Sequence, residues 1–528
     1  MEKRVLIALA LTFIILIVYQ VLFVKPPPQD VQKQPKLEEK EKPLTEEPKE
    51  TLPIVSELDT VTAEEKEIKV ETELYSAVFT TKGATIKYFE LKKHKDEFGK
   101  NVVLLKSPGL NPPLGIGSKD DFELADSNFE LTGKDLTLNK DYETGSVVFE
   151  YNNSDFSVKR TYTFYNDTYK IDIKDEISGM PDYWITLGTN FGIHNNKDTF
   201  IHVGPVLLKD TDRIEFNPKK VTEPVVYKER LKWIAQEDKY FFAALVPVTT
   251  VEEAKVWKQK DSAVIAFRGT PGMNSFILYA GPKEYDTLKA LNIGLEHIVD
   301  FGFFSIIALP LFWILKFFYK ITHNYGWAII FLTLIIRIPF IPLINKSQKS
   351  MKKMQELQPK MAELREKYKK DPQRLQREMM DLYKKYKVNP VGGCLPILLQ
   401  IPVFFALYKI LMIAIELRGA PFMLWIKDLS APDTLFGHLP EWLPLIGGFA
   451  VGPLPVLMGA SMIIQQKMTP TSLDPRQNKI MMLMPVIFTF LFLNFASGLV
   501  LYWLMNNVFS IIQQFYANKK LAKEAGKV

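Results

Sequence analysis

Hydrophobic and polar residues follow two different periods along this chain. From about residue 54 to residue 286 they alternate, and the clearest example is the run from Tyr169 to Lys174, in which every second residue is charged. Alternation with period two is typical of strands that are buried on one face. Asn152-Asn153 and Asn166-Asp167 separate such runs in the manner of turns. This pattern predicts an all-β domain over residues 54–286, most simply a sandwich.

The second half of the chain has long apolar runs in place of alternation. They cover Phe301–Phe318, Trp327–Ile344, Gly392–Ile415, Leu443–Ile464 and Ile480–Phe515. Roughly 20 helical residues cross a hydrocarbon core of about 30 Å, so the last run is too long for one span. Asn494 to Gly498 lies near its middle and indicates a turn between two helices. We therefore expect a helical membrane bundle over residues 327–516.

The chain begins with another apolar run, Val5 to Val24, which follows Lys3 and Arg4. Its length and the lack of a small-x-small cleavage site favour an uncleaved anchor over residues 1–24; the alternative is a cleaved secretory signal. Residues 25–53, rich in Pro, Lys, Glu and Gln, predict a disordered tether. With the N-terminus inside, the β-domain lies outside the cytoplasm.

Charge sets the expected topology. The net charge is only +6, but basic residues are concentrated between Asn345 and Val388 and again in the tail, residues 517–528. The positive-inside rule places both segments in the cytoplasm. An odd number of spans must then separate the β-domain from the basic loop. We expect residues 301–320, interrupted by Pro310, to form an amphipathic helix in the outer interface. That gives six spans with both termini inside; the alternative, in which both runs cross, puts the basic loop outside.

The basic loop at residues 346–388 has a pattern of its own. Its apolar residues recur every three or four positions, at Met351, Met354, Leu357, Met361, Leu364 and Tyr368, and again at Leu375, Met379, Leu382 and Tyr386. Asp371 and Pro372 suit a helix cap and a first helical position. The loop predicts a two-helix hairpin with Lys369, Lys370, Asp371 and Pro372 at its turn. It is either a docking arm for a ribosome, a nascent chain or lipid headgroups, or a solvated hairpin without a partner.

Arg337 is a single charge inside an apolar run. A charge at mid-span costs a few kcal/mol, so it normally faces a partner or water. Thr333 lies four residues earlier on the same helical face. The predicted spans contain no Asp or Glu, which indicates a wet cavity around Arg337. The alternative is an arginine that extends toward the cytoplasmic surface.

Other chemistry is sparse. A single cysteine, Cys394, excludes an intrachain disulfide. His194, Asp198 and His202 match no metal-ligand spacing, and the chain has no phosphate-binding loop or hydrolase motif. We therefore expect no cofactor, metal, catalytic residue or DNA partner. A sugar-modifying β-domain stays open, because many β-sandwiches bind sugars, but no carboxylate pair can be singled out from the sequence.

Several motifs in the membrane half resemble YidC-type membrane protein insertases. They are Asn389 to Pro396 with Gln400-Ile401-Pro402, then Glu416-Leu417-Arg418, Leu424-Trp425-Ile426, Met484-Pro485, and Ser497 to Trp503. Arg337 falls where that family keeps one arginine in a groove. The β-domain, with Trp233-Ile234-Ala235 and Tyr240-Phe241, resembles the Gram-negative form more loosely.

The resemblance implies a function and a site. It implies a non-enzymatic insertase and chaperone of the bacterial inner membrane, with a periplasmic β-super-sandwich and a hydrophilic groove open to the cytoplasm. Arg337, Thr333, Tyr502, Trp503 and Gln400 are the groove residues it implies. Trp503 stands where a second tyrosine is common, and the basic tail is short. Implied partners are nascent and newly made membrane proteins, the Sec translocon (SecYEG and SecDF), the ribosome and membrane lipids.

Two other functions compete with insertion. In a solute or anion channel Arg337 would be a selectivity element, which predicts a through-pore and an internal repeat, and no repeat is visible. An anchored sugar-binding domain leaves the hairpin and the spans without a role. The absence of an ATP motif means that an insertase must draw on the partitioning of its substrate's own apolar surface.

Overall fold

The structure is a computed structural model that describes residues 64–524 apart from 97, 108, 110, 196–200, 387, 389–394, 443–446 and 469–474. The predicted anchor (residues 1–24), the tether (residues 25–53), Asp198 and the end of the basic tail lie outside the described residues. The chain divides into two compact units, Met1–Gly281 and Pro282–Val528. Each unit is described by itself.

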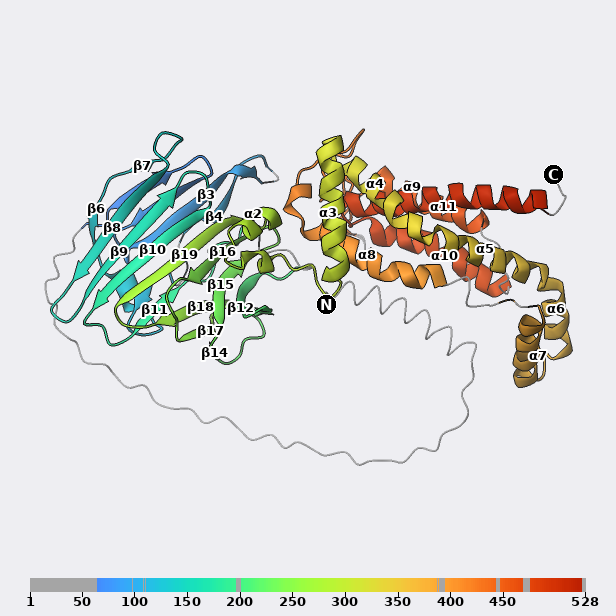
Figure 1. The fold of residues 1–528 in the computed structure, drawn as a ribbon, viewed down its shortest axis with the longest axis horizontal. Coiled ribbons are helices and arrows are strands. Elements are labelled where there is room, and N and C mark those ends of the chain that lie inside the picture. The colour runs from blue at the N-terminus through green and yellow to red at the C-terminus, as the bar shows by residue number, and fades with distance from the viewer. Residues whose placement is uncertain are drawn as a thin grey trace, which may run out of the picture. The chain divides into compact units, whose positions relative to one another are not determined.

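The described residues of the first unit form three β-sheets (Figure 1). The largest has nine strands in the order β13 (Asp212–Glu215), β12 (Gly204–Lys209), β15 (Leu231–Glu237), β16 (Phe241–Pro247), β19 (Met273–Pro282), β10 (Lys170–Ser178), β9 (Ser157–Tyr165), β8 (Thr144–Asn152) and β6 (Glu130–Thr132). One five-stranded sheet has the order β4 (Asn101–Leu105), β3 (Thr85–Lys95), β2 (Tyr75–Thr80), β1 (Glu67–Glu71) and β7 (Leu136–Thr137). The other has the order β14 (Val225–Lys228), β17 (Glu253–Gln259), β18 (Ser262–Gly269), β11 (Tyr183–Thr186) and β5 (Ile116–Gly117).

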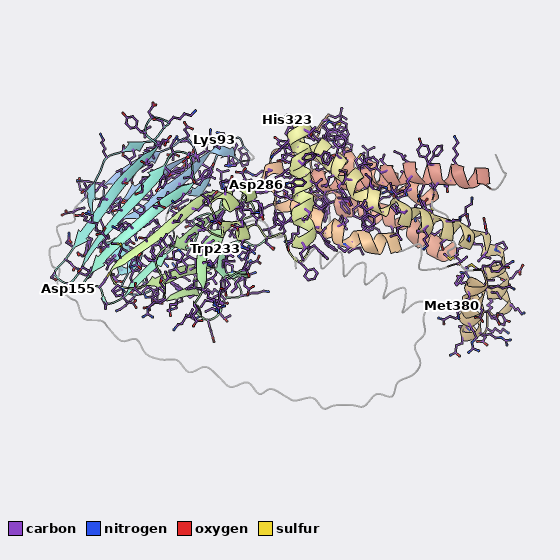
Figure 2. The ribbon with its side chains drawn as sticks, in the orientation of Figure 1. Lys93, Asp155, Trp233, Asp286, His323 and Met380 are labelled. Carbon is purple, nitrogen blue, oxygen red and sulfur yellow. The ribbon has the colours of Figure 1, made fainter. Side chains whose placement is uncertain are left out.

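Both five-stranded sheets pack on the same face of the nine-stranded sheet. Phe79 of β2 lies 4.7 Å from Tyr162 of β9, measured between ring centroids. Phe276 of β19 stacks on Phe267 of β18 at 6.5 Å. Tyr162 and Phe276 both pair with Ile173 of β10, so they point to the same side of the sheet. The period-two pattern thus folds as a two-layer β-sandwich, whose core includes the fully buried Trp233 (Figure 2).

A buried ion pair joins the nine-stranded sheet to the five-stranded sheet that contains β11. Arg160 of β9 and Asp175 of β10 are cross-strand partners, and both side chains are inaccessible to solvent. The guanidinium donates Nε and Nη2 to the two carboxylate oxygens, each at 2.7 Å, and Nη1 to the carbonyl of Leu114 at 2.6 Å. Tyr183 of β11 donates its hydroxyl to the same carboxylate at 2.5 Å. Each of these contacts joins two neighbouring strands or the two layers of the sandwich. Together they fix the positions of the two layers relative to each other.

The second unit is helical. After the short helices α2 (Tyr285–Ala290) and η2 (Leu295–Ile298) it contains α3 (Ser305–Thr322), α4 (Tyr325–Arg337), η3 (Ile338–Phe340), α5 (Ile341–Glu356), α6 (Gln358–Lys367), α7 (Pro372–Lys385), α8 (Leu395–Ile413), η5 (Ile415–Leu417), α9 (Pro453–Met468), α10 (Pro475–Phe492) and α11 (Ser497–Glu524). The predicted turn near Asn494 is confirmed, because α10 ends and α11 begins on either side of it.

Two stretches of the described chain are long and apolar enough to cross a membrane. They are Ser305–Thr322 and Tyr325–Glu356, and Gln400–Ile413 and Met482–Phe492 are shorter apolar helices. The expected count of six spans is therefore not established by helix length and composition. The first stretch is α3, which was expected to lie in the interface. In Figure 1 it runs crosswise to α8 and α11.

The predicted hairpin is present in α6 and α7, with two differences. The helical run breaks at Leu357, so that α5 and α6 are separate helices. The hairpin core is Leu357, Met361 and Val388, flanked by Met354, Met379, Leu382 and Tyr383. Tyr383 takes the place expected for Tyr386, which is 37% exposed. The reason is that α7 ends at Lys385, so the helical spacing from Leu382 no longer holds at Tyr386. Met380 of α7 is exposed (Figure 2).

Candidate functional site

Arg337 is the last residue of α4. The helix is capped by the residue that precedes it, Asn324, whose side chain accepts hydrogen bonds from the backbone N–H groups of Gly326 (2.9 Å) and Trp327 (3.2 Å). Beyond Arg337 the chain continues as the 3₁₀ turn η3, which contains Pro339, and then as α5. Proline lacks the N–H that a regular α-helix would use at this point. The sequence thus ends the regular helix directly after its only charge.

The Arg337 side chain is buried, with 9% exposure, and it is held by α11. Nε and Nη2 donate to Oε1 of Gln513 at 3.2 and 3.0 Å. Nη1 donates to Oδ1 of Asn506 at 2.9 Å and to the backbone carbonyl of Asn506 at 3.2 Å. Within the described part of the chain, no carboxylate forms an ion pair with this guanidinium.

A small pocket with a cavity volume of about 20 Å³ opens beside the guanidinium. Its lining residues are Thr333, Ile336, Arg337, Phe340, Ile344, Gln400, Tyr502 and Asn506. Four of the five predicted groove residues are thus brought together by α4, α8 and α11. Tyr502 is 2% exposed and shares a side-chain hydrogen bond with Gln400. The Thr333 hydroxyl donates to the carbonyl of Ile329 at 2.7 Å, so it presents an oxygen acceptor to the pocket.

Trp503 lies outside this pocket. Its ring packs against Phe404, Phe488 and Phe492, with centroids 5.0, 5.8 and 5.1 Å away. Successive residues on a helix are turned by about 100°, so Tyr502 and Trp503 cannot face the same way. Trp503 is therefore part of an aromatic cluster between α8, α10 and α11.

Sequence reasoning missed the two residues that hold Arg337. Asn506 and Gln513 stand four and eleven residues after Tyr502. At 3.6 residues per turn these positions lie on one face of α11, which is otherwise rich in apolar residues near its start. This polar stripe could have indicated Asn506 and Gln513 from the sequence. The contact between α11 and α4 could not be inferred from it.

A second charged group lies at the opposite end of α4. Glu416 of η5 is half-buried near Tyr325, the first residue of α4, outside the apolar helices themselves. Burial, together with the carboxylates of Glu284 and Asp286, raises the pKa of Glu416 to about 7, against a smaller opposing effect from Lys316. Lys316 in turn pairs with Asp286 at 2.6 Å.

The turn of the α6–α7 hairpin is exposed. Asp371 accepts a hydrogen bond from the backbone N–H of Arg374 at 3.0 Å and so caps α7, with Pro372 in its first turn. Lys369 and Lys370 are exposed beside it.

In the β-unit, His194 and His202 contact the backbone carbonyls of Val103 and Pro205, and among the described residues no group of potential ligands could hold a metal.

The fold and the pocket together define a class of protein: a helical membrane unit with a buried cation, joined to a large β-domain. Comparison with known proteins is consistent with this class. The model of the YidC periplasmic domain matches residues 67–314, and the model of the 60Kd inner membrane protein family matches residues 317–524. The chain belongs to the YidC family of membrane protein insertases.

Relatives match over nearly the whole chain. The membrane protein insertase YidC of Geotalea uraniireducens is 40% identical over 99% of this chain and 100% of its own length. That of Geobacter metallireducens is 39% identical over 100% of both. A solved structure, described as an active YidC insertase with the first transmembrane domain resolved, covers 86% of this chain and 93% of its own at 22% identity and a TM-score of 0.39. The protein is thus a non-enzymatic membrane protein insertase of the inner membrane with a periplasmic domain.

Proposed function

We propose that insertion takes place at the pocket beside Arg337. The observation that carries this proposal is a buried guanidinium whose described partners are all neutral oxygens. Such a group attracts polar or acidic parts of an incoming chain and lowers the free energy of moving them partway into the membrane. Thr333, Tyr502 and Gln400 supply further polar atoms beside it. The apolar segment of the substrate then enters lipid along the helices.

The orientation in this proposal follows from charge. The basic residues of the α5–α7 region and of the C-terminal tail favour a cytoplasmic location for both, with six spans in total and both termini in the cytoplasm. Arg337 lies at the end of α4 that leads into α5 and the hairpin, so its pocket opens toward the cytoplasm. The periplasmic domain precedes α3.

In the same proposal α3 lies in the membrane–water interface on the periplasmic side of the inner membrane. Ile306, Trp313, Phe317 and Ile321 are exposed along one side of α3, while Leu311, Phe312 and Leu315 are buried on the other. Aromatic residues on an exposed helical face suit the interface. Lys316 contacts the ring of Phe312 at 4.4 Å and pairs with Asp286, which supports a position near water.

The hairpin is the element we propose for docking. Its outer face carries Lys369 and Lys370 beside the capped turn at Asp371 and Pro372. A basic, exposed surface of this kind attracts ribosomal RNA or anionic lipid headgroups. The Sec translocon is a further proposed partner, which would receive or supply substrates at the bundle.

Charge dependence tests the proposal. Two substrates would be compared in proteoliposomes: one with a translocated tail that carries aspartates, and a matched one with asparagines at those positions. We expect Arg337→Ala to reduce insertion of the acidic tail about tenfold relative to the neutral tail, which corresponds to the loss of about one charge-assisted hydrogen bond. Arg337→Lys, which keeps the charge, should retain most of the preference. Equal insertion of both tails by Arg337→Ala and by the unaltered protein would refute the role.

A further inference from the structure

The contacts of Arg337 contain a feature that the insertion proposal does not explain. A guanidinium has five N–H donors and no acceptor, and in a buried position it is most often paired with a carboxylate. Here Asn506 and Gln513 of α11 supply the acceptors, and both side chains are neutral. The positive charge is therefore hydrogen-bonded without being neutralised.

The orientation of the Gln513 amide is fixed from its other side. Its Nε2 donates to Oδ1 of Asn345 in α5 at 2.8 Å. With the amide nitrogen engaged there, Oε1 points to Arg337, where it accepts from both Nε and Nη2. Asn345, Gln513 and Arg337 thus form a chain of hydrogen bonds from α5 through α11 to α4. This chain holds the guanidinium at the edge of the pocket.

Asn506 holds the other side of the guanidinium through two atoms. Nη1 donates to both the side-chain oxygen and the backbone carbonyl of Asn506. Ser510, one turn later, donates its hydroxyl to the same carbonyl at 2.8 Å. Asn506 lines the pocket together with Arg337, so this hydrogen bond lies at the pocket wall.

We propose that Asn506 and Gln513 are positioning and specificity-determining residues: they hold Arg337 with neutral acceptors, which a carboxylate of the incoming chain displaces. This inference rests on the proposed role of Arg337. A carboxylate adds charge–charge attraction and can accept two parallel hydrogen bonds from a guanidinium, so exchange of an amide oxygen for a substrate carboxylate is favourable. A resident carboxylate would neutralise the arginine permanently, because breaking a buried ion pair is costly. Amides keep the arginine in place and leave its charge available to the substrate.

The test supplies the carboxylate that the native site lacks. Gln513→Glu and, as a second variant, Asn506→Asp would each be assayed as the full chain in proteoliposomes with the acidic and neutral tails described above. We expect each variant to lower the ratio of acidic-tail to neutral-tail insertion about tenfold. Insertion of the neutral tail reports whether each variant is folded. Tyr516→Glu is the matched control, because it adds the same charge to α11 at a side chain that is 67% exposed.

The double variant Arg337→Ala/Gln513→Glu separates this inference from the role of Arg337. Without the arginine, the new carboxylate has no cation to neutralise, so we expect Gln513→Glu to lower the ratio much less in the Arg337→Ala background than in the unaltered protein. If Arg337→Ala leaves the ratio unchanged, the proposed function fails. If Arg337→Ala lowers the ratio and neither Gln513→Glu nor Asn506→Asp does, the inference about the amides is overturned. An equal loss with Tyr516→Glu would also overturn it, because the effect would then be one of general charge.

Discussion

The Arg160–Asp175 pair gives the most quantitative prediction for the periplasmic domain. Asp175→Asn keeps the size of the side chain but removes the charge opposite a guanidinium that is wholly buried. The new amide also places N–H donors where Arg160 and Tyr183 donate at 2.7 and 2.5 Å. Removal of one partner from a buried ion pair costs about 3–5 kcal/mol. We expect the free energy of unfolding of the domain to fall by that amount.

The assay is amide hydrogen exchange in the full-length protein in nanodiscs. A loss of about 3–5 kcal/mol increases exchange of the β9 and β10 amides roughly 100- to 4,000-fold, at 1.4 kcal/mol per factor of ten. The control is Arg160→Met/Asp175→Leu, which replaces both charges with apolar groups and should remain within about 2 kcal/mol of the unaltered domain. The reasoning is refuted if Asp175→Asn lowers the free energy of unfolding by less than about 1 kcal/mol. It is also refuted if the double variant loses as much as the sum of its two single substitutions.

Two further predictions concern the ends of α4. Because the pKa of Glu416 is raised to about 7 in the fold from 4.5, the native state binds more protons, so this group lowers stability as pH rises from about 4.5 to 7. Glu416→Gln should therefore raise the Tm at pH 8 and leave it nearly unchanged at pH 4.5; an equal gain at both pH values would contradict this. Asn324→Ala removes a helix cap that also donates to the carbonyls of Pro421 and Phe422, and should cost about 1–2 kcal/mol in denaturant unfolding. Asn324→Asp, which keeps the cap acceptor, should lose less, and the reasoning fails if Asn324→Asp loses more.

The sequence allowed the type of most elements to be predicted, because each has a clear hydrophobic period. The alternation around Ile171 correctly predicts a strand, and Asp371-Pro372 correctly predicts the start of a helix. Both features are determined by residues that are close together in the sequence. Arg337 was identified because a charge is costly in an apolar run. These are local properties that a single sequence carries.

Contacts between distant segments could not be predicted in the same way. The pairing of Arg337 with Gln513 joins residues 176 positions apart, and nothing in either segment specifies the other. The family resemblance grouped Trp503 with Tyr502, whereas the rotation between successive helical residues places its ring in a different cluster. Arg160 and Asp175 stand in alternating strand sequences that do not distinguish them from solvent-exposed charges, and only the packing of two sheets on one face shows them to be buried.

The central claim is that substrates pass through the Arg337 pocket, and site-specific photo-crosslinking tests it most directly. A crosslinker would replace Thr333 or Tyr502 in the full-length protein, with Ile464 of α9, which is 51% exposed and outside the pocket lining, as the control position. Ribosome-bound nascent membrane proteins of increasing length would then be irradiated. We predict adducts from both pocket positions at intermediate lengths and much weaker ones from Ile464. Crosslinks from Ile464 that match or exceed those from both pocket positions at every length would contradict the account.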